Sequence, residues 1–198
     1  MPNLSKTELQ KIYSREIDYL FDGVGNISNP YHFFYLSTIK DNFPYTRTIV
    51  LRNVKNNPLK IYFNTDIRSP KIDHLKLNPN CSVLFYDNKR KLQLRLSCIA
   101  YINHKNKFAK GIWKKTQLQS RKCYMGEFSP SLEVDKYEPN IPKKYLKCDP
   151  RKEDSEKGFE NFSSIELIIN YLDILELHHD GHIRFRVDSN NKFSFITI

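Results

Sequence analysis

Basic and hydroxyl side chains gather in one stretch of the chain, residues 45–71, at spacings that suit a phosphate group. The side chains concerned are Arg47, Arg52, Arg68, Ser69 and Lys71. Guanidinium and ammonium groups bind phosphate through charge-assisted hydrogen bonds, and a serine hydroxyl adds a further donor. The stretch therefore predicts a binding site for a phosphorylated ligand.

A hairpin is the first element that would position these side chains. Two apolar, β-branched and aromatic runs, residues 46–54 and 59–65, are separated by Asn56-Asn57-Pro58. Asparagine tolerates a positive φ and proline fixes φ, so this tripeptide predicts a tight turn between two paired strands.

A helix is the second positioning element, over residues 69–77. Ser69 can serve as its N-cap, Pro70 suits its first turn, and Asn78-Pro79 ends it. The free N–H groups at a helix start favour an anion. An ordinary capped helix with solvated charges fits the same residues, so this feature alone leaves both interpretations open.

The rest of the chain predicts a mainly β fold with flanking helices. An amphipathic helix is expected over residues 4–22, where Ser5 and Glu8 form a capping box, and another over residues 105–122, with a break near Thr116. Further strands are expected at residues 31–39, 82–86, 92–102, 165–177, 182–187 and 192–198. These elements predict a small, mostly antiparallel barrel of about six to seven strands.

A single domain spanning residues 1–198 is expected for a chain of this length. Within it, residues 1–23 contain the N-terminal helix. Residues 126–161 carry many charges and prolines with little periodicity, which predicts a long loop or insertion.

Composition narrows the class of protein further. The net charge of +10 indicates either an anionic partner or a compositional bias with solvated charges. No nucleic-acid-binding motif, signal pattern or apolar run of membrane-spanning length occurs, so we expect neither a nucleic acid nor a membrane as partner. The four cysteines lack zinc-site spacing, which favours reduced thiols and a cytoplasmic location. His178, His179 and His182 are interpreted as an exposed turn, and no metal site is predicted.

The order of motifs resembles the FMN-binding split barrel of the pyridoxamine 5′-phosphate oxidase superfamily. The matching segments are Arg47-Thr48-Ile49-Val50-Leu51-Arg52, Asn64-Thr65-Asp66-Ile67-Arg68-Ser69-Pro70-Lys71, Asn78-Pro79, Gln93 and His182-Ile183-Arg184-Phe185. The resemblance runs from about Pro44 to Ile198 and diverges over residues 126–161. It implies an antiparallel split barrel that binds FMN, in a homodimer with FMN at the interface.

The resemblance also implies roles for individual residues. Arg47, Ser69 and Lys71 would bind the FMN phosphate, and Gln93 and Arg184 would reach the flavin ring from the partner subunit. The cofactor contacts implied in full are Arg47, Val50, Leu51, Arg52, Asn64, Thr65, Arg68, Ser69, Lys71, Gln93 and Arg184. No catalytic residue is indicated.

The substrate side departs from the family pattern. True pyridoxamine phosphate oxidases place a Tyr and an Arg where Ile112 and Thr116 stand here, and only Ser120 is kept. Candidate contacts to a small-molecule substrate are Arg52, Ser120 and His182. We therefore expect an FMN-dependent oxidoreductase of unknown substrate. The alternatives are a non-catalytic flavin-binding or sensing protein, a true pyridoxine or pyridoxamine 5′-phosphate oxidase, and a basic nucleic-acid-binding module.

Overall fold

Alternation of buried and outward-facing side chains builds the strands of this protein, which the computed structural model describes over residues 5–198. In β6 (Leu92–His104), Leu94 and Leu96 are buried, whereas Gln93 and Arg95 lie on the opposite face and are only partly buried. Side chains two residues apart share one face of a strand. Each long strand therefore has a core side and an outer side.

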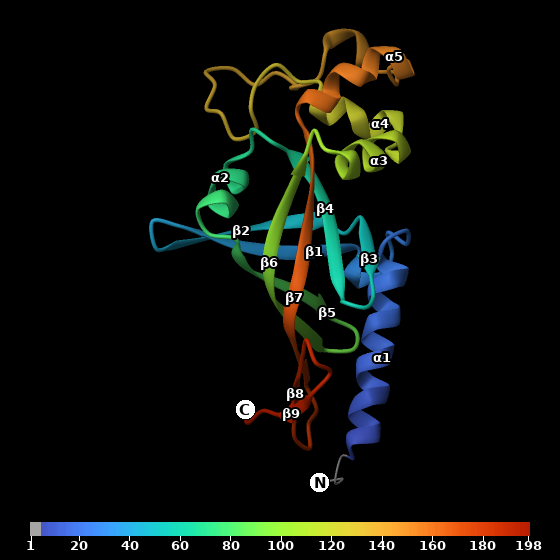
Figure 1. The fold of residues 1–198 in the computed structure, drawn as a ribbon, viewed down its shortest axis with the longest axis vertical. Coiled ribbons are helices and arrows are strands. Elements are labelled where there is room, and N and C mark those ends of the chain that lie inside the picture. Colours follow the sequence, from blue (N-terminus) through green and yellow to red (C-terminus); the bar gives the residue numbers. More distant parts are fainter. Residues whose placement is uncertain (1–4) are drawn as a thin grey trace.

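Within the described residues, nine strands form one antiparallel sheet (Figure 1). They are β1 (Phe33–Lys40), β2 (Phe43–Val50), β3 (Asn53–Lys55), β4 (Lys60–Asp66), β5 (Asn80–Asp87), β6 (Leu92–His104), β7 (Phe162–Glu176), β8 (Ile183–Asp188) and β9 (Phe193–Phe195). Their order is β2-β1-β5-β6-β7-β4-β3, and β8 pairs with both β7 and β9.

The sheet divides at β7. One side of β7 pairs with β6 along nearly its whole length. On its other side, the first half pairs with β4 and the second half with β8. The predicted antiparallel split barrel is thus confirmed. Its strands number nine in residues 5–198 instead of six to seven, partly because the predicted run 46–54 forms two strands, β2 and β3.

Helices surround the sheet unevenly (Figure 1). The α-helices are α1 (Lys6–Gly23), α2 (Pro70–Leu77), α3 (Lys107–Lys115), α4 (Leu118–Arg121) and α5 (Lys152–Ser155), with 3₁₀ turns at Pro30–His32, Lys122–Tyr124, Lys143–Tyr145 and Glu156–Glu160. Helices α3, α4 and α5 gather at one end of β6 and β7, and the β8–β9 hairpin lies at the other end. None of the helices described in residues 5–198 is long and apolar enough to cross a membrane.

The hydrophobic core lies between the inner face of the sheet and α1. Phe34, Phe63 and Phe85 are fully buried and pack ring against ring, with centroids 5.3–6.0 Å apart. Leu9 and Leu20 of α1 belong to the same cluster. The predicted amphipathic helix is confirmed from Lys6 onward, with its capping box, and residues 1–4 lie outside the described part.

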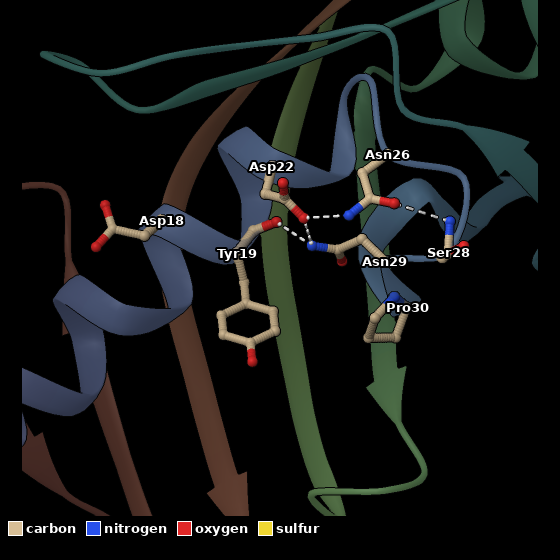
Figure 2. Close-up of a pocket in the computed structure, with 7 residues that line it drawn as sticks. All are labelled: Asp18, Tyr19, Asp22, Asn26, Ser28, Asn29 and Pro30. Atoms are coloured by element: carbon tan, nitrogen blue, oxygen red, sulfur yellow. Dashed lines mark hydrogen bonds between the residues drawn. The ribbon is translucent and has the colours of Figure 1, made fainter.

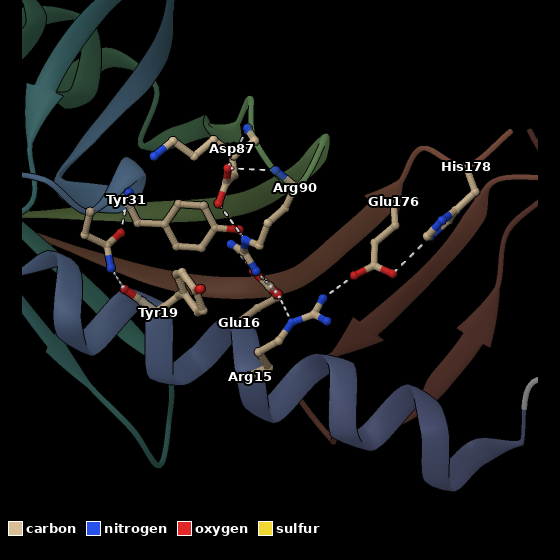
Figure 3. Close-up of polar contacts among 10 residues, drawn as sticks. Arg15, Glu16, Tyr19, Tyr31, Asp87, Arg90, Glu176 and His178 are labelled. Carbon is tan, nitrogen blue, oxygen red and sulfur yellow. Dashed lines mark hydrogen bonds and ion pairs between the residues drawn. The ribbon is translucent and has the colours of Figure 1, made fainter.

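A buried carboxylate anchors α1 to the sheet (Figure 3). Glu16 is 0% exposed and accepts a hydrogen bond from the Tyr31 hydroxyl at 2.6 Å. Arg90, in the turn between β5 and β6, donates to Glu16 at 2.7 Å. Arg15 also bonds to Glu16 and reaches Glu176 at the end of β7. The charge of Glu16 is therefore compensated by groups from three parts of the chain.

The prediction of one continuous strand over residues 46–54 was wrong. It splits into β2, which pairs with β1, and β3, which pairs with β4. Between them, Leu51 N donates to His32 O at 2.9 Å and Arg52 N donates to Tyr62 O at 2.8 Å. The chain therefore changes neighbours at this point. The predicted turn connects β3 and β4, with Asn57 at a φ of 59°.

Two other expectations held in part. The helix over residues 105–122 breaks as predicted, because Thr116 is the C-cap of α3 and α4 follows. Residues 126–161 form a long connection, but its second half contains the short helix α5 and two 3₁₀ turns. In its first half, Asn140 closes a loop by donating to Phe128 O at 2.7 Å and accepting from Phe128 N at 3.1 Å.

Candidate functional site

A cluster of two cations and two hydroxyls lies where β2, β4 and α2 meet. We call Arg47, Thr65, Ser69 and Lys71 the basic corner. Lys71 Nζ donates to Thr65 Oγ1 at 3.1 Å and to Ser69 Oγ. Arg47 Nη1 donates to Leu36 O at 3.1 Å and to Thr38 Oγ1 at 2.8 Å. The structure thus brings four of the predicted phosphate-binding and cofactor-binding residues together.

The local sequence explains this geometry. Thr65 is the next-to-last residue of β4, and Ser69 is the N-cap of α2 with Pro70 in the first turn. The Ser69 hydroxyl makes no capping hydrogen bond, because it accepts one from Lys71 instead. Both hydroxyls are therefore held by the lysine, and the predicted capping role of the Ser69 side chain is replaced by a role in the cluster.

The electrostatics of the basic corner favour an anion. Burial, together with the nearby charge of Arg47, lowers the pKa of Lys71 to about 8, against a smaller opposing effect of Asp66. Burial also lowers the pKa of Arg47. No carboxylate within residues 5–198 forms an ion pair with either side chain, although most of the half-buried arginines have one. An anion placed here would offset the repulsion between the two cations.

Arg68, also predicted to contact the cofactor, is turned elsewhere. Its guanidinium binds the Asp66 carboxylate at 2.7 and 3.0 Å. It also donates to the carbonyls of Gly126 and Glu127 at 3.1 and 2.9 Å. Arg68 therefore connects the corner after β4 to the start of the long loop.

A second group of predicted residues lines a pocket under α3. We call this hollow of about 580 Å³ the α3 pocket; it is lined by Arg52, Asn64 and Ser120, all predicted as cofactor or substrate contacts. Asn64 and Thr65 are neighbours in β4, so their side chains leave opposite faces of the strand. The α3 pocket and the basic corner consequently lie on the two sides of the end of β4.

Two polar atoms of the α3 pocket have no protein partner. Asn64 Oδ1 and Ser164 Oγ are buried and make no hydrogen bond within the described residues. Asn64 pairs with Ser164 across β4 and β7. Unpartnered buried polar atoms are uncommon, because each one costs about 1–3 kcal/mol of desolvation. A ligand with polar edges would satisfy both.

Sequence reasoning missed several other residues that line the α3 pocket: His32, Tyr62, Lys115, Tyr124 and Ser164. Two of them had a readable signal. Tyr62 precedes Asn64 by two residues and so shares its face of β4. Lys115 lies about one helical turn after Ile112, and Ile112 stands where the family has a substrate-binding tyrosine. His32, Tyr124 and Ser164 come from distant segments, and no feature of the sequence pointed to them.

The phenols of the α3 pocket stay protonated. Burial, with a contribution from the carboxylate of Glu166, raises the pKa of Tyr62 to about 12. Burial likewise raises the pKa of Tyr124. Both hydroxyls are consequently available as hydrogen-bond donors at neutral pH.

Gln93 and Arg184 lie on the outer face of the sheet, in one row across three strands. Gln93 pairs with Leu175 of β7, and Leu175 pairs with Arg184 of β8. Arg184 is held by Asp173, at 3.1 Å from Nε to Oδ1 and 3.0 Å from Nη2 to Oδ2. Burial would raise the pKa of Asp173, but Arg184 and Arg95 hold it below its usual range.

Within one chain, the row of Gln93, Leu175 and Arg184 lies far from the α3 pocket. Ser164 of the pocket pairs with Asn103, which lies ten residues after Gln93 on the same strand, β6. At 3.3 Å per residue, the separation along the strand is about 33 Å, longer than a flavin ring system. Within one chain, Gln93 and Arg184 therefore lie apart from the candidates of the α3 pocket.

The remaining candidates are dispersed. Leu51 is fully buried in the core, and Val50 ends β2 opposite Phe33. His182 is exposed in the turn before β8, where its Nδ1 accepts a hydrogen bond from His178 N at 3.1 Å. No group of three or more potential metal ligands occurs in residues 5–198, and the histidines of this turn form none.

A further hollow at the end of α1 contains none of the predicted residues (Figure 2). Its Asp22 carboxylate accepts hydrogen bonds from Asn26 at 2.9 Å and Asn29 at 2.7 Å. Asn29 also donates to Tyr19 O. These bonds connect the end of α1 to the turn before β1, which gives the cluster a structural role.

One family model matches part of the chain. The family model described as pyridoxamine 5′-phosphate oxidase, FMN-binding domain, matches residues 14–104. No curated protein matches the sequence.

Solved structures share the fold. A pyridoxamine 5′-phosphate oxidase-related, FMN-binding protein from Nostoc punctiforme has a TM-score of 0.69 and 18% identity, covering 99% of this chain and 98% of its own. PhzG from Burkholderia lata, in complex with tetrahydrophenazine-1-carboxylic acid, has a TM-score of 0.65 and 16% identity, covering 100% and 94%. A Clostridium acetobutylicum protein related to general stress protein 26 has a TM-score of 0.55 and 11% identity, covering 90% and 96%. At these identities the likeness concerns the fold alone.

Proposed function

We propose that this chain, whose residues 14–104 match the family model of the pyridoxamine 5′-phosphate oxidase FMN-binding domain, is a member of that superfamily, binds FMN and acts as a flavin-dependent oxidoreductase on a small molecule. FMN would supply the redox chemistry, and the protein would supply binding, orientation and electrostatics. The proposal depends above all on the basic corner.

The basic corner fits the phosphate of FMN. Arg47 and Lys71 would neutralise it, and the hydroxyls of Thr65 and Ser69 would add hydrogen bonds. Burial and Arg47 lower the pKa of Lys71 to about 8 in the protein alone, so a bound phosphate would restore its full charge. Arg68 would act indirectly, because its guanidinium is engaged by Asp66 and the loop.

The α3 pocket, on the other side of the end of β4, fits the flavin ring and a substrate beside it. Asn64 Oδ1 and Ser164 Oγ have no hydrogen-bond partner among residues 5–198 and would meet the polar edge of the ring. Val50, Leu51 and Arg52 precede β3 and would approach the ring through the backbone between β2 and β3. Arg52 and Ser120 line the same pocket and would contact substrate.

A homodimer would complete the site. The outer face that carries Gln93 and Arg184 also exposes large apolar side chains: Phe33 at 46%, Tyr35 at 49% and Tyr86 at 41%. Tyr86 pairs directly with Gln93 across β5 and β6. Burial of such a patch by a second copy would stabilise a dimer. It would also bring Gln93, Arg184 and His182 of the partner toward the FMN of the first chain.

Oxidation of pyridoxine or pyridoxamine 5′-phosphate has less support. The positions that bind the substrate phosphate in true oxidases are occupied by Ile112 and Thr116. The Thr116 hydroxyl donates to Ile112 O at 3.0 Å, so it is already used within α3. A non-catalytic flavin-binding or sensing role remains the second candidate, since the sequence indicates no catalytic residue. The four free cysteines suit a reducing compartment such as the cytoplasm.

Flavin binding is the first test. Purified protein should be yellow, or should take up FMN after removal of small molecules, with one FMN per chain measured by absorbance. Protein that takes up no FMN would refute both flavin roles. If FMN binds, reduction by a nicotinamide or amine donor supports the oxidoreductase, and failure with every donor favours the binding protein. Turnover of pyridoxamine 5′-phosphate with oxygen would instead identify a true oxidase.

A further inference from the structure

We propose that Thr38 and His74 are positioning residues of the basic corner, which hold the Arg47 guanidinium in the orientation that binds the FMN phosphate. We call the hydrogen-bonded chain from Arg47 through Thr38 to His74 the Thr38 relay. The inference rests on the proposed function, because it explains how one cation of that site is fixed. Neither Thr38 nor His74 belongs to the motifs on which the resemblance to the family rests.

One nitrogen of the Arg47 guanidinium is already bound by the protein. Nη1 donates to Leu36 O at 3.1 Å and to Thr38 Oγ1 at 2.8 Å. Nε and Nη2 make no hydrogen bond within residues 5–198. These two nitrogens form one edge of the planar group, and such an edge can bind two phosphate oxygens in parallel. The bonds from Nη1 therefore fix the plane of the guanidinium and leave that edge free for a ligand.

The hydroxyl of Thr38 connects Arg47 to His74. Thr38 is 0% exposed, and its Oγ1 lies 3.0 Å from His74 Nδ1. A guanidinium can only donate, so Thr38 Oγ1 accepts from Arg47 and its own proton needs an acceptor. His74 Nδ1 supplies that acceptor, since the hydroxyl has no further partner within residues 5–198. A proton on Nδ1 would instead leave the buried hydroxyl proton unpaired, which is unfavourable. The relay thus runs from donor to acceptor, with the His74 proton on Nε2.

The surroundings of His74 keep its ring neutral, as this direction requires. Burial lowers the pKa of His74 below its ordinary value of 6.5, and the positive charges of Arg47 and Lys40 add to that effect. Asp73 and Asp41 oppose it more weakly. The ring is therefore uncharged at neutral pH, and Nδ1 is free to accept.

Helix α2 connects the two cations of the basic corner. Lys71 lies in its first turn, and His74 follows about one turn later. His74 is 4% exposed, and the ring of Tyr45 packs against it with centroids 4.7 Å apart. A ring held in this way gives the Thr38 hydroxyl an acceptor of fixed position. One helix thereby places Lys71 directly and orients Arg47 through the relay.

The first test compares threonine variants by fluorescence titration of the apo protein with FMN. Thr38→Val keeps the shape of the side chain but removes the hydroxyl, and we expect FMN to bind about tenfold more weakly. Thr38→Ser keeps the hydroxyl and should stay within about twofold of wild type. Thr46→Val is the matched control, because the Thr46 hydroxyl is hydrogen-bonded to that of Ser37 at 2.8 Å on the exposed surface. This control should bind FMN as the wild type does.

The second test replaces the acceptor of the relay. An asparagine places an amide oxygen about where Nδ1 stands, whereas a leucine offers no acceptor. His74→Asn should therefore keep the affinity within about threefold of wild type, and His74→Leu should weaken it about tenfold. In an Arg47→Ala background, neither Thr38→Val nor His74→Leu should cause a further loss, because both act through Arg47. Nitrogen NMR at neutral pH should show Nδ1 without a proton, and the His74 signals are those missing from the His74→Asn spectrum.

Several results would contradict the relay. They are equal losses in Thr38→Val and Thr46→Val, a loss in Thr38→Ser as large as in Thr38→Val, a further loss in the Arg47→Ala background, or a proton on Nδ1. Melting temperatures are measured on every variant, and if Thr38→Val does not fold, the two His74 variants decide.

The proposed function fails by a different result, the absence of FMN uptake by the wild-type protein. Inorganic phosphate is then titrated into the same variants and should show the same order of affinities. If phosphate does not bind, or binds every variant equally, the relay is refuted as well. Normal FMN uptake with equal affinities in all variants refutes the relay alone.

Discussion

The basic corner and the α3 pocket lie on the two sides of the end of β4, yet they are built in opposite ways. In the corner, Lys71 is bonded to Thr65 and Ser69, and these three residues lie within seven positions of the chain. In the pocket, Asn64 Oδ1 and Ser164 Oγ make no hydrogen bond, and Arg52 and Lys115 form no ion pair, within residues 5–198. A site whose groups already hold one another suits a fixed group such as a cofactor phosphate. An open site suits a molecule that enters and leaves.

Removing the cations of the basic corner should have the largest effect. We expect Arg47→Ala with Lys71→Ala to weaken FMN binding about 10²–10⁴-fold, because two charge-assisted hydrogen bonds are lost. Fluorescence titration of apo protein with FMN measures this. Lys76→Ala is the matched control, since Lys76 is an exposed lysine of the same helix that pairs with Asp73. An unchanged affinity in the double variant would place the phosphate elsewhere.

The affinity for FMN should depend on pH through Lys71 of the basic corner. Burial and the charge of Arg47 lower the pKa of Lys71 to about 8, and only the protonated amine pairs with phosphate. Binding then takes up a proton above that pH, and affinity should fall by up to about tenfold per pH unit. Lys71→Arg should remove this dependence, because guanidinium stays charged. A flat profile in the wild-type protein would contradict a titrating Lys71.

In the protein without FMN, Lys71 should lower the free energy of unfolding at neutral pH. The pKa of Lys71 is lower in the folded chain than its ordinary 10.5, so the unfolded chain binds more protons between about pH 8 and 10.5 and stability rises with pH across that window. Lys71→Met should abolish this rise. At neutral pH it should stabilise the apo protein by about 1 kcal/mol, or ~2–4 °C in Tm. Thermal unfolding measures both, and a destabilised variant would indicate a structural role instead.

Mixed dimers should test whether Arg184, on the outer face of the sheet, serves the partner's site. The expected effect is a twofold change in the amount of bound FMN. Chains with Arg47→Ala and Lys71→Ala are coexpressed with chains carrying Arg184→Ala, and the mixed dimer is isolated with two affinity tags. If Arg184 serves the partner's FMN, the mixed dimer keeps one intact site and should bind about half the FMN of the wild type. Each variant alone should bind little. Absence of any rescue would mean that each chain completes its own site.

The basic corner could be predicted from sequence because its geometry is local. The step from Thr65 through Ser69 to Lys71 is fixed by a strand end and a helix start, and Pro70 marks that start. Arg47 was recognised by the motif it opens, and the structure then placed it beside the others. What sequence could not provide was the partner of the Ser69 hydroxyl, which depends on the path of the Lys71 side chain.

The parts that were missed depend on contacts between distant segments. The break between β2 and β3 arises because Leu51 bonds to His32 whereas Arg52 bonds to Tyr62, and neither partner can be read from the run itself. The row of Gln93, Leu175 and Arg184 depends on a register that shifts at Ser97 and Cys98. The α3 pocket draws on residues between Val24 and Ser164, and their convergence is a property of the fold.

The buried Glu16 has a consequence for the order in which the chain can be completed during translation. Its helix emerges early, but its partner Arg90 follows 74 residues later, and the contact from Arg15 to Glu176 spans 161 residues. Until β5, β6 and β7 have left the ribosome, Glu16 can pair with Tyr31 but not with Arg90, and α1 lacks the part of the core that these strands supply. Such distant contacts make folding slow. Helix α1 can therefore complete its packing only after the last strands have formed. A nascent chain halted before β7 would expose the apolar face of α1 to chaperones.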